Sequence, residues 1–300
     1  MVNQVTRERL ESLGLLYRQL CQAMPTGADE LTRAEITEAV YQSNAIEYSS
    51  LTFQETESVL GGRTLMRELP VREIFEAVNL AKVMAELTES DLPPLTTQTV
   101  LHWHQTLLAN IRDDAAGRYR QAGEWVRVGA HLGANPEFVS GLLQWYADAD
   151  QMWFLDRIAK FHLEFEVIHP FVDGNGRIGR VLITQQLLQL GWPPLTIRAK
   201  GRTRDYYPLF DSYVITEKYD AGSKLLSVLL AESLHRRITA LRARRTITLA
   251  RWAHDHDLPG NSVTSKAKRQ TIPAFRLRDR WMIDADFNGD TDQWLAEMRS

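Results

Sequence analysis

The chain has 300 residues, a formal net charge of −3 and 44% hydrophobic residues, enough for one large or two modest domains with a buried core. Its single cysteine, Cys21, excludes an internal disulfide, and no apolar run approaches the ~20 residues needed to span a bilayer. The polar N-terminus lacks the apolar core of a signal peptide. These features predict a cytoplasmic protein with no membrane partner.

Apolar residues at helical spacing predict a mainly α fold through most of the chain. The predicted helices cover residues 5–22, 32–47, 67–88, 97–111, 138–168, 177–190 and 203–240. Thr32 and Glu35 have the spacing of a capping box, which places the start of the second helix at Thr32. Between Gly117 and Pro136, several glycines and the strand-like run 125–128 predict a small hairpin or an ordered loop.

The segment HPFVDGNGRIGR, from His169 to Arg180, carries the strongest chemical signal. Pro170 stops the incoming helix, and Gly174-Asn175-Gly176 allows backbone conformations that other residues rarely adopt. A glycine-bearing loop at a helix N-terminus directs free N–H groups outward at the positive end of the helix dipole. This arrangement predicts an anion site suited to phosphate.

The charged residues of the segment fit the same chemistry. Arg177 and Arg180 lie three residues apart in the first turn of the helix, where cations are unfavourable unless a polyphosphate lies between them. Asp173 supplies one hard oxygen ligand, and magnesium in nucleotide sites is often held by one carboxylate with phosphate oxygens and water. His169 is able to accept a proton near neutral pH. Together they predict phosphoryl or nucleotidyl transfer, against the alternative of a tight loop with surface arginines.

HPFVDGNGRIGR resembles the signature of the Fic family, HPFx(D/E)GNGRxxR, at every defining position. The resemblance implies a Fic helical-bundle core and transfer of AMP from ATP to a Ser, Thr or Tyr hydroxyl of a target protein. By matching position, His169 is the general base, Phe171 anchors the loop in the core, and Asp173 binds Mg²⁺ (or Mn²⁺). The same match assigns phosphate contacts to Gly174, Asn175, Gly176, Arg177 and Arg180.

Two further stretches resemble parts of that family. The run Val126, Arg127, Val128 and Gly129, preceded by Gly117-Arg118-Tyr119-Arg120, resembles the flap that aligns the target segment by backbone pairing; a plain surface hairpin is the alternative. Arg204-Asp205-Tyr206-Tyr207 resembles the stretch near adenine, so Tyr206 and Tyr207 are expected ATP contacts unless they are core or rim tyrosines. We expect His162, like His102, His104 and His131, to be packed and not catalytic.

The predicted helix 32–47 carries a carboxylate in an unusual place. Glu47 falls on its apolar side, whereas Glu35, Glu38 and Gln42 fall on the other. An unpaired carboxylate there is costly to bury, so it needs a cationic partner inside the protein. The run Ser43-Asn44-Ala45-Ile46-Glu47 resembles the family's inhibitory motif, (S/T)xxxE(G/N), whose Glu pairs with the second motif arginine, here Arg180. Tyr48 departs from the motif's Gly or Asn; a solvent-facing Glu at a frayed helix end is the alternative.

Residues 244–300 differ from the rest of the chain in their sequence pattern, with shorter predicted elements separated by turns. Residues 246–256 and 262–269 predict two short helices, the second basic, and 271–284 predict strand, turn and strand. KRQTIPAFRLRDRWMID resembles the winged helix of excisionase-type proteins, which implies DNA binding; a part for homodimer formation or for recognising a protein target is the alternative. We therefore expect an N-terminal region with the inhibitory helix (1–95), a Fic catalytic core (96–243) and a winged helix-turn-helix-like domain (244–300).

The predicted function is autoinhibited protein adenylyltransfer with ATP as substrate. One alternative is a DNA-binding transcriptional regulator whose Fic domain senses nucleotide, and another is an enzyme that removes AMP from its target. The presence of His169, Asp173 and both arginines disfavours the sensor, because a sensor has no need of the base.

Overall fold

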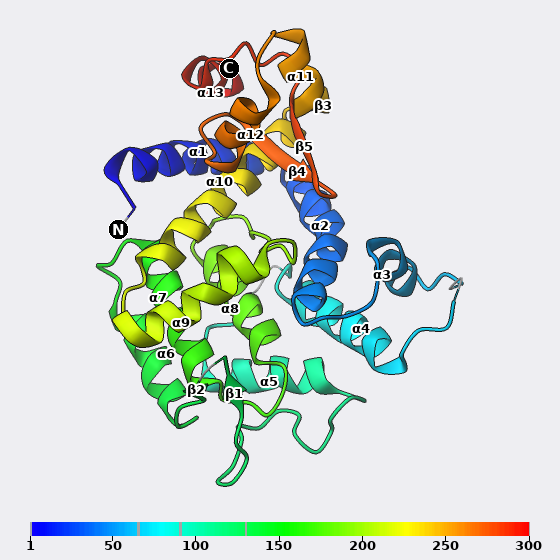
Figure 1. Cartoon of the computed structure of the whole chain (residues 1–300), viewed down its shortest axis with the longest axis vertical. Coiled ribbons are helices and arrows are strands. Elements are labelled where there is room, and N and C mark those ends of the chain that lie inside the picture. The colour runs from blue at the N-terminus through cyan, green and yellow to red at the C-terminus, as the bar shows by residue number, and fades with distance from the viewer. Residues whose placement is uncertain (1, 65–66, 90–91, 130, 300) are drawn as a thin grey trace. The chain divides into compact units, whose positions relative to one another are not determined.

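The computed structural model describes residues 2–64, 67–89, 92–129 and 131–299. Contacts within the chain group these residues into two compact units (Figure 1). Unit 1 comprises Arg33–Leu190 and Thr196–Ser223, and unit 2 comprises Val2–Thr32, Gly191–Leu195 and Lys224–Ser300. Two helices, α2 (Pro25–Ile46) and α10 (Asp220–Leu241), contribute residues to both units.

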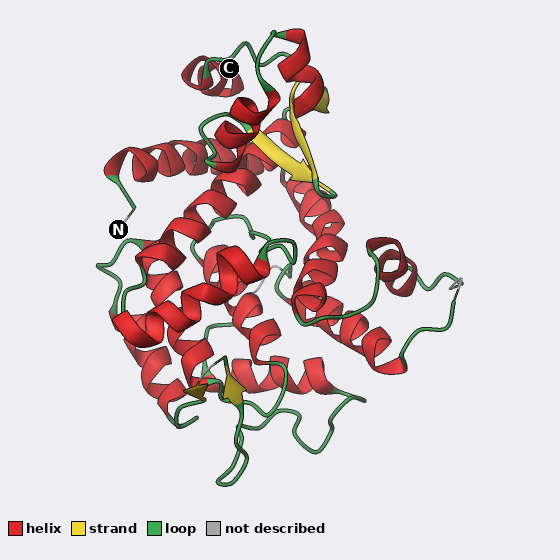
Figure 2. Ribbon diagram, viewed as in Figure 1, coloured by secondary structure: helices red, strands yellow, loops and turns green. Residues whose placement is uncertain are grey.

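The regular structure of unit 1 is mostly helical, with long loops between the helices (Figure 2), which confirms the mainly α prediction. Besides part of α2, it holds α3 (Phe53–Leu60), α4 (Val71–Glu86), α5 (Thr97–Leu108), α6 (Phe138–Asp148), α7 (Phe154–Ile168), α8 (Asn175–Gln189), the π-helix η1 (Arg202–Tyr206) and α9 (Tyr207–Thr216). Helix α7 packs against α6, α8 and α9, and α8 also packs against α4 and α5. Both α7 and α8 are buried along most of their length. Packing therefore fixes the end of α7 and the start of α8, which lie on either side of the loop 169–174.

The structure corrects the start of the second predicted helix. Helix α2 begins at Pro25, and the Thr32 hydroxyl donates to the Ala28 carbonyl at 2.9 Å inside the helix. The predicted capping box at Thr32 and Glu35 is therefore wrong. Pro25 fits the first position of a helix because its missing N–H has no partner there in any case.

The side of α2 that lies opposite the predicted apolar side is also covered by protein in part. Glu38 and Gln42 are buried. Arg198 donates to the Glu38 carboxylate at 2.8 Å, and the Ala199 amide donates to the Gln42 side chain at 2.9 Å. The loop after α8, which holds Arg198 and Ala199, thus covers the polar side of α2. Helical periodicity alone does not predict this cover.

The predicted hairpin is present and short. Strand β1 (Arg127–Val128) pairs antiparallel with β2 (His131–Leu132), with Arg127 opposite Leu132 and Val128 opposite His131. Trp125 lies outside the strand and is 72% exposed. The predicted helix 138–168 is two helices, α6 and α7, separated by a turn.

Unit 2 combines helices with a small sheet. It holds α1 (Gln4–Ala23), α11 (Leu249–Asp255), α12 (Gly260–Lys268), α13 (Thr291–Arg299), and strands β3 (Thr246–Thr248), β4 (Ala274–Leu277) and β5 (Arg280–Asp284). The antiparallel sheet has the order β3-β5-β4, and α11 packs against β5, β3 and α12. The two short helices and the strand–turn–strand are present, but residues 246–248, predicted as the start of the first of these helices, form strand β3 instead. Their interpretation as a winged helix, and the division at residues 95 and 243, remain proposals.

None of the helices in the described ranges is long and apolar enough to cross a membrane.

Candidate active site

A cavity of about 530 Å³ lies in unit 1, between the end of α7, the start of α8, the hairpin, α9 and the residues after α2. Most of the predicted site residues line it: His169, Gly174, Asn175, Gly176, Arg180, Glu47, Tyr206, Tyr207, Arg127, Val128 and Gly129. Of the other predicted residues, Ser43, Asp173 and Arg177 are bonded to groups at its edge, and Phe171 lies behind the loop. The fold therefore gathers segments far apart in the sequence around one space.

His169 lies at the C-terminal end of α7 in a left-handed conformation, with φ of 49°. Residues other than glycine rarely adopt this conformation unless their surroundings hold them there. The buried Arg120 provides that hold, because its guanidinium donates to the carbonyls of His169 at 2.9 Å and Ile168 at 3.0 Å. It also donates to the Ala134 carbonyl, which ties the hairpin to the same helix end. The sequence did not predict this role, because Arg120 stood out only as part of the segment that precedes the hairpin.

The loop after His169 is anchored by side chains that bond its backbone. Phe171 is fully buried and stacks on the His104 ring, with centroids 3.6 Å apart. The Asn175 side chain accepts from the Phe171 amide and donates to the Phe171 carbonyl, both at 2.8 Å. Asn175 therefore shapes the loop with its side chain, and its backbone N–H at the start of α8 is the group that we expect to meet a phosphate.

His104 supports the loop from behind. The Gly117 amide donates to its Nδ1 at 3.1 Å, so Nε2 carries the proton and donates to the Asp173 carbonyl at 3.0 Å. Burial lowers the pKa of His104 to about 4, which keeps the ring neutral at physiological pH. His104 is packed, as expected, but it also orients the backbone beside the candidate metal carboxylate.

The N-terminus of α8 has the character of an anion site. Gly174 has φ of 80°, and among the described residues no side chain caps the first turn of this 15-residue helix. A Cβ at Gly176 would overlap the Glu47 carboxylate, so glycine is required for that carboxylate to approach the turn. A negatively charged group of the protein thus already lies where the helix dipole favours an anion.

Arg180 is bound by the end of α2, as the sequence predicts. Its Nε donates to the Ser43 hydroxyl at 2.9 Å, and one terminal nitrogen donates to the Ser43 carbonyl at 3.0 Å and to Glu47 Oε1 at 2.8 Å. Burial opposes the charge of Arg180, but Glu47 raises the pKa of the guanidinium above its ordinary value. Glu47 itself is 43% exposed, so the expectation of a buried carboxylate is wrong: the helix ends at Ile46 and the carboxylate faces the cavity.

Tyr48 adopts the left-handed conformation that the Gly or Asn of the inhibitory motif would supply more easily, with φ of 65°. Two contacts hold this end. The Arg202 guanidinium lies 4.4 Å over the Tyr48 ring, and the Tyr207 hydroxyl donates to the Ile46 carbonyl at 2.7 Å. Tyr206 is buried with its hydroxyl 2.8 Å from His162 Nε2, so Tyr207 is the more accessible of the two tyrosines.

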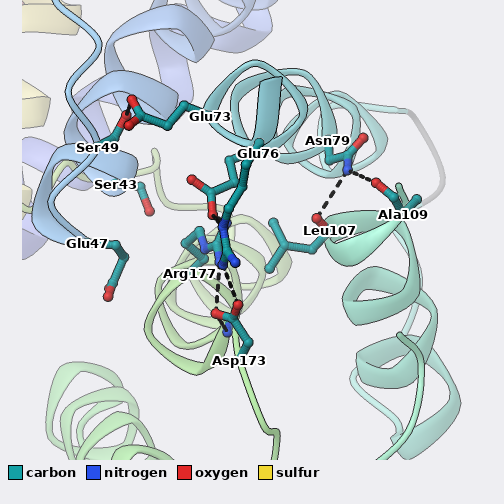
Figure 3. Close-up of polar contacts among 12 residues, drawn as sticks. Ser43, Glu47, Ser49, Glu73, Glu76, Asn79, Leu107, Ala109, Asp173 and Arg177 are labelled. Atoms are coloured by element: carbon teal, nitrogen blue, oxygen red, sulfur yellow. Dashed lines mark hydrogen bonds and ion pairs between the residues drawn. The ribbon is translucent and has the colours of Figure 1, made fainter. Parts of the chain in front are cut away.

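Asp173 belongs to a ring of alternating charges, part of which is drawn in Figure 3. Its Oδ2 is 2.5 Å from Arg72 and its Oδ1 is 3.2 Å from Arg177. Glu76 closes the ring, at 3.0 Å from Arg72 and 3.2 Å from Arg177. Arg72 and Glu76 come from α4 and were not found from the sequence, which has no local pattern that links them to Asp173.

The Asp173 carboxylate suits a divalent metal bound together with a nucleotide. Burial raises its pKa, but Arg177 and Arg72 lower it below the usual range, so it is ionised at neutral pH. Arg72 is 53% exposed and can leave Oδ2 free. Over the described ranges, no three His, Cys, Asp or Glu side chains gather to hold a metal. A magnesium ion here would therefore rely on Asp173 together with phosphate oxygens and water.

Comparison with known proteins finds a family model and relatives that match the part of the chain that holds this site. Residues 94–187 match the model of the Fic/DOC family, so the chain contains a Fic domain and His169 to Arg180 lie inside it. The protein adenylyltransferase Fic of Nematostella vectensis is 29% identical over 227 residues, which are 69% of this chain and 50% of that protein. The protein of the same name from Drosophila willistoni is 27% identical over 176 residues, 56% of this chain and 35% of that one. The chain thus spans half or less of the length of these curated relatives.

Solved structures show the same fold. Fic-1 (residues 134–508) from C. elegans superposes with a TM-score of 0.67 at 23% identity, over 80% of this chain and 73% of that one. A Fic family protein from Desulfovibrio desulfuricans superposes with a TM-score of 0.67 at 18% identity, over 97% of this chain and 98% of that one.

Proposed function

We propose that the chain is a protein adenylyltransferase, which transfers AMP from ATP to a Ser, Thr or Tyr hydroxyl of a target protein, and that Glu47 inhibits it. One observation carries the proposal: a single cavity holds a histidine, an uncapped helix N-terminus and a buried arginine whose anionic partner is a carboxylate of the same chain. The names of the curated relatives favour the same activity.

The reaction follows from the positions of these groups. His169 accepts the proton of the target hydroxyl, and the hydroxyl oxygen attacks the α-phosphorus. The bond from that phosphorus to the bridging oxygen breaks, and pyrophosphate leaves. The N–H groups of Asn175 and Gly176 and the guanidinium groups of Arg177 and Arg180 bind the phosphates. The Gly174 N–H, which donates to Asp173 Oδ1 at 2.6 Å, joins them when that bond opens. Asp173 would hold Mg²⁺ or Mn²⁺, which would neutralise charge on the α- and β-phosphates.

The inhibitory role of Glu47 has an electrostatic basis. Its carboxylate bonds Arg180 and lies against Gly176, so a γ-phosphate at the same place would meet a like charge. Ser43 adds two acceptors that keep Arg180 turned toward α2. ATP must therefore bind with its terminal phosphate displaced, or replace Glu47 on Arg180.

Substrate positioning is assigned to the remaining cavity walls. Tyr206 and Tyr207 form the wall proposed for adenine. Arg127, Val128 and Gly129 line the cavity and, with Val126 before them, form the flap proposed to align the target segment. We propose that residues 244–300 bind a partner, which is DNA, a protein target or a second copy of the chain.

The test uses ATP labelled at the α-phosphate. Wild type, Glu47→Gly and Glu47→Gly/His169→Ala are incubated with magnesium and a cell lysate, and label on protein is measured. We expect strong label with Glu47→Gly, weak label with wild type and none with the double variant. The matched control is Glu217→Gly, which removes an exposed carboxylate from a left-handed helix end outside the cavity lining and should behave as wild type.

Absence of label from every sample that binds ATP would refute AMP transfer. Release of AMP from an AMP-modified protein by wild type would then favour hydrolytic removal of AMP from the target, and nucleotide-dependent DNA binding would favour the regulator.

A further inference from the structure

A buried carboxylate lies one turn before the candidate base. Glu166 of α7 is almost fully buried, yet it contributes to the wall of the active-site cavity. His169 Nδ1 is 3.1 Å from the Glu166 carbonyl oxygen and 3.5 Å from Glu166 Oε2. Nδ1 therefore faces two acceptors of one residue, and Nε2 is the nitrogen left for a substrate.

Helix α8 provides the space for this carboxylate. A Cβ at Gly179 would overlap Glu166 Oε1 and would lie 3.2 Å from His162 Nδ1. Both of these atoms are buried without a hydrogen-bond partner among the described residues. The Glu166 carboxylate is thus accommodated because position 179 has no side chain, although its burial is costly.

The surrounding charges favour an ionised Glu166. Burial raises the pKa of Glu166, but the contact with His169, followed by the nearby His162 and Arg180, lowers the pKa below its usual range. Burial lowers the pKa of His162 to about 4, so that ring adds no charge at neutral pH. The other charged groups that line the cavity around His169 are Glu47 after α2, Arg127 of β1 and Asp211 of α9.

A buried carboxylate that lacks part of its hydrogen bonds is costly, and such groups are found most often at functional sites. We propose that Glu166 is the positioning residue of the base: it holds His169 with the Nδ1 proton inward and Nε2 toward the substrate, and its negative charge stabilises the imidazolium formed when Nε2 takes the hydroxyl proton. Gly179 is required because only glycine leaves room for this carboxylate. The proposal rests on the proposed role of His169 as the base.

The experiment compares three changes in the Glu47→Gly background. Glu166→Gln removes the charge and keeps the shape. Gly179→Ala favours the helix but displaces the Glu166 carboxylate. The control, Glu164→Gln, makes the same chemical change on the same helix, at a carboxylate whose partner is the Tyr213 hydroxyl at 2.5 Å.

Two readouts are used: the tautomer of neutral His169 from ¹⁵N NMR, and the pH dependence of AMP transfer. With Glu166→Gln we expect a larger share of the Nε2–H tautomer. We also expect the acidic limb of the profile to move to lower pH by about one unit, because an adjacent negative charge favours imidazole protonation. The turnover number should fall on the order of 10-fold, with the KM for ATP nearly unchanged. Gly179→Ala should act in the same direction, and Glu164→Gln should match its parent.

Glu166→Gln and Gly179→Ala variants that keep the parent tautomer and the parent pH profile would overturn the proposal. If Glu47→Gly transfers no AMP at all, the proposed function fails, and the tautomer measurement alone decides whether Glu166 orients His169.

Discussion

Replacement of Glu47 by Gln tests the inhibitory contact through binding, independently of catalysis. The Arg180–Glu47 bond at 2.8 Å is charge-assisted, a class worth about 1.5–3 kcal/mol. Glu47 is 43% exposed, however, and solvent screening reduces its contribution to about 1 kcal/mol. An ATP analogue that needs Arg180 should therefore bind Glu47→Gln roughly 5-fold more tightly than wild type.

The assay is calorimetric titration of α,β-methylene ATP with magnesium held constant. Ser43→Ala gives the graded comparison, because it removes the 2.9 Å hydrogen bond to Arg180 Nε and leaves the Ser43 carbonyl contact in place. Its gain in affinity should be smaller than that of Glu47→Gln, and only the Glu47 effect should shrink with added salt. Equal affinity of wild type and Glu47→Gln would refute competition between Glu47 and the γ-phosphate for Arg180.

Three further predictions concern the surroundings of the site. Arg72→Ala frees the Asp173 carboxylate, so Mn²⁺ with an ATP analogue should bind ~3-fold more tightly by electron paramagnetic resonance, whereas Arg67→Ala should change nothing. Asn79→Leu leaves two carbonyls at the end of α5 without their donor (Figure 3), and urea unfolding should show a loss of about 2–3 kcal/mol. The pKa of His104 is about 4 in the folded protein, below its ordinary 6.5, so the unfolded chain binds more protons between these values. Stability should therefore fall as pH drops from 6.5 toward 4, and His104→Gln should make urea unfolding less dependent on pH in that window.

The contiguous part of the site was predictable from the sequence because its chemistry is local. From His169 to Arg180, each proposed role follows from a residue type and its position at a helix end or in a glycine loop. The Glu47–Arg180 pair was predictable too, since a motif resemblance and a helical face pointed to the same partner. The structure has both the loop and the pair.

The parts that depend on distant packing were not predictable in the same way. Arg120 bonds carbonyls 48 and 49 positions further along the chain, and Arg72 reaches Asp173 over 101 positions. No local periodicity encodes such partners. For the same reason the burial of Glu38 was not predicted: the segment that covers it, around Arg198, lies 160 positions away.

Each motif arginine of the site is already paired with a carboxylate of the protein, so a ligand must displace a protein group in order to bind. Arg177 is matched by Asp173 and Glu76, and Arg180 is matched by Glu47. A nucleotide triphosphate that binds Arg180 productively must replace Glu47, and a metal that binds Asp173 must replace Arg72. The released Arg72 adds positive charge beside the phosphates and the released Glu47 adds negative charge, so the two released charges offset each other and each exchange favours the other. Binding of metal should therefore assist displacement of Glu47, and a nucleotide without metal should be held in the displaced, unproductive position that the Glu47–Arg180 pair enforces.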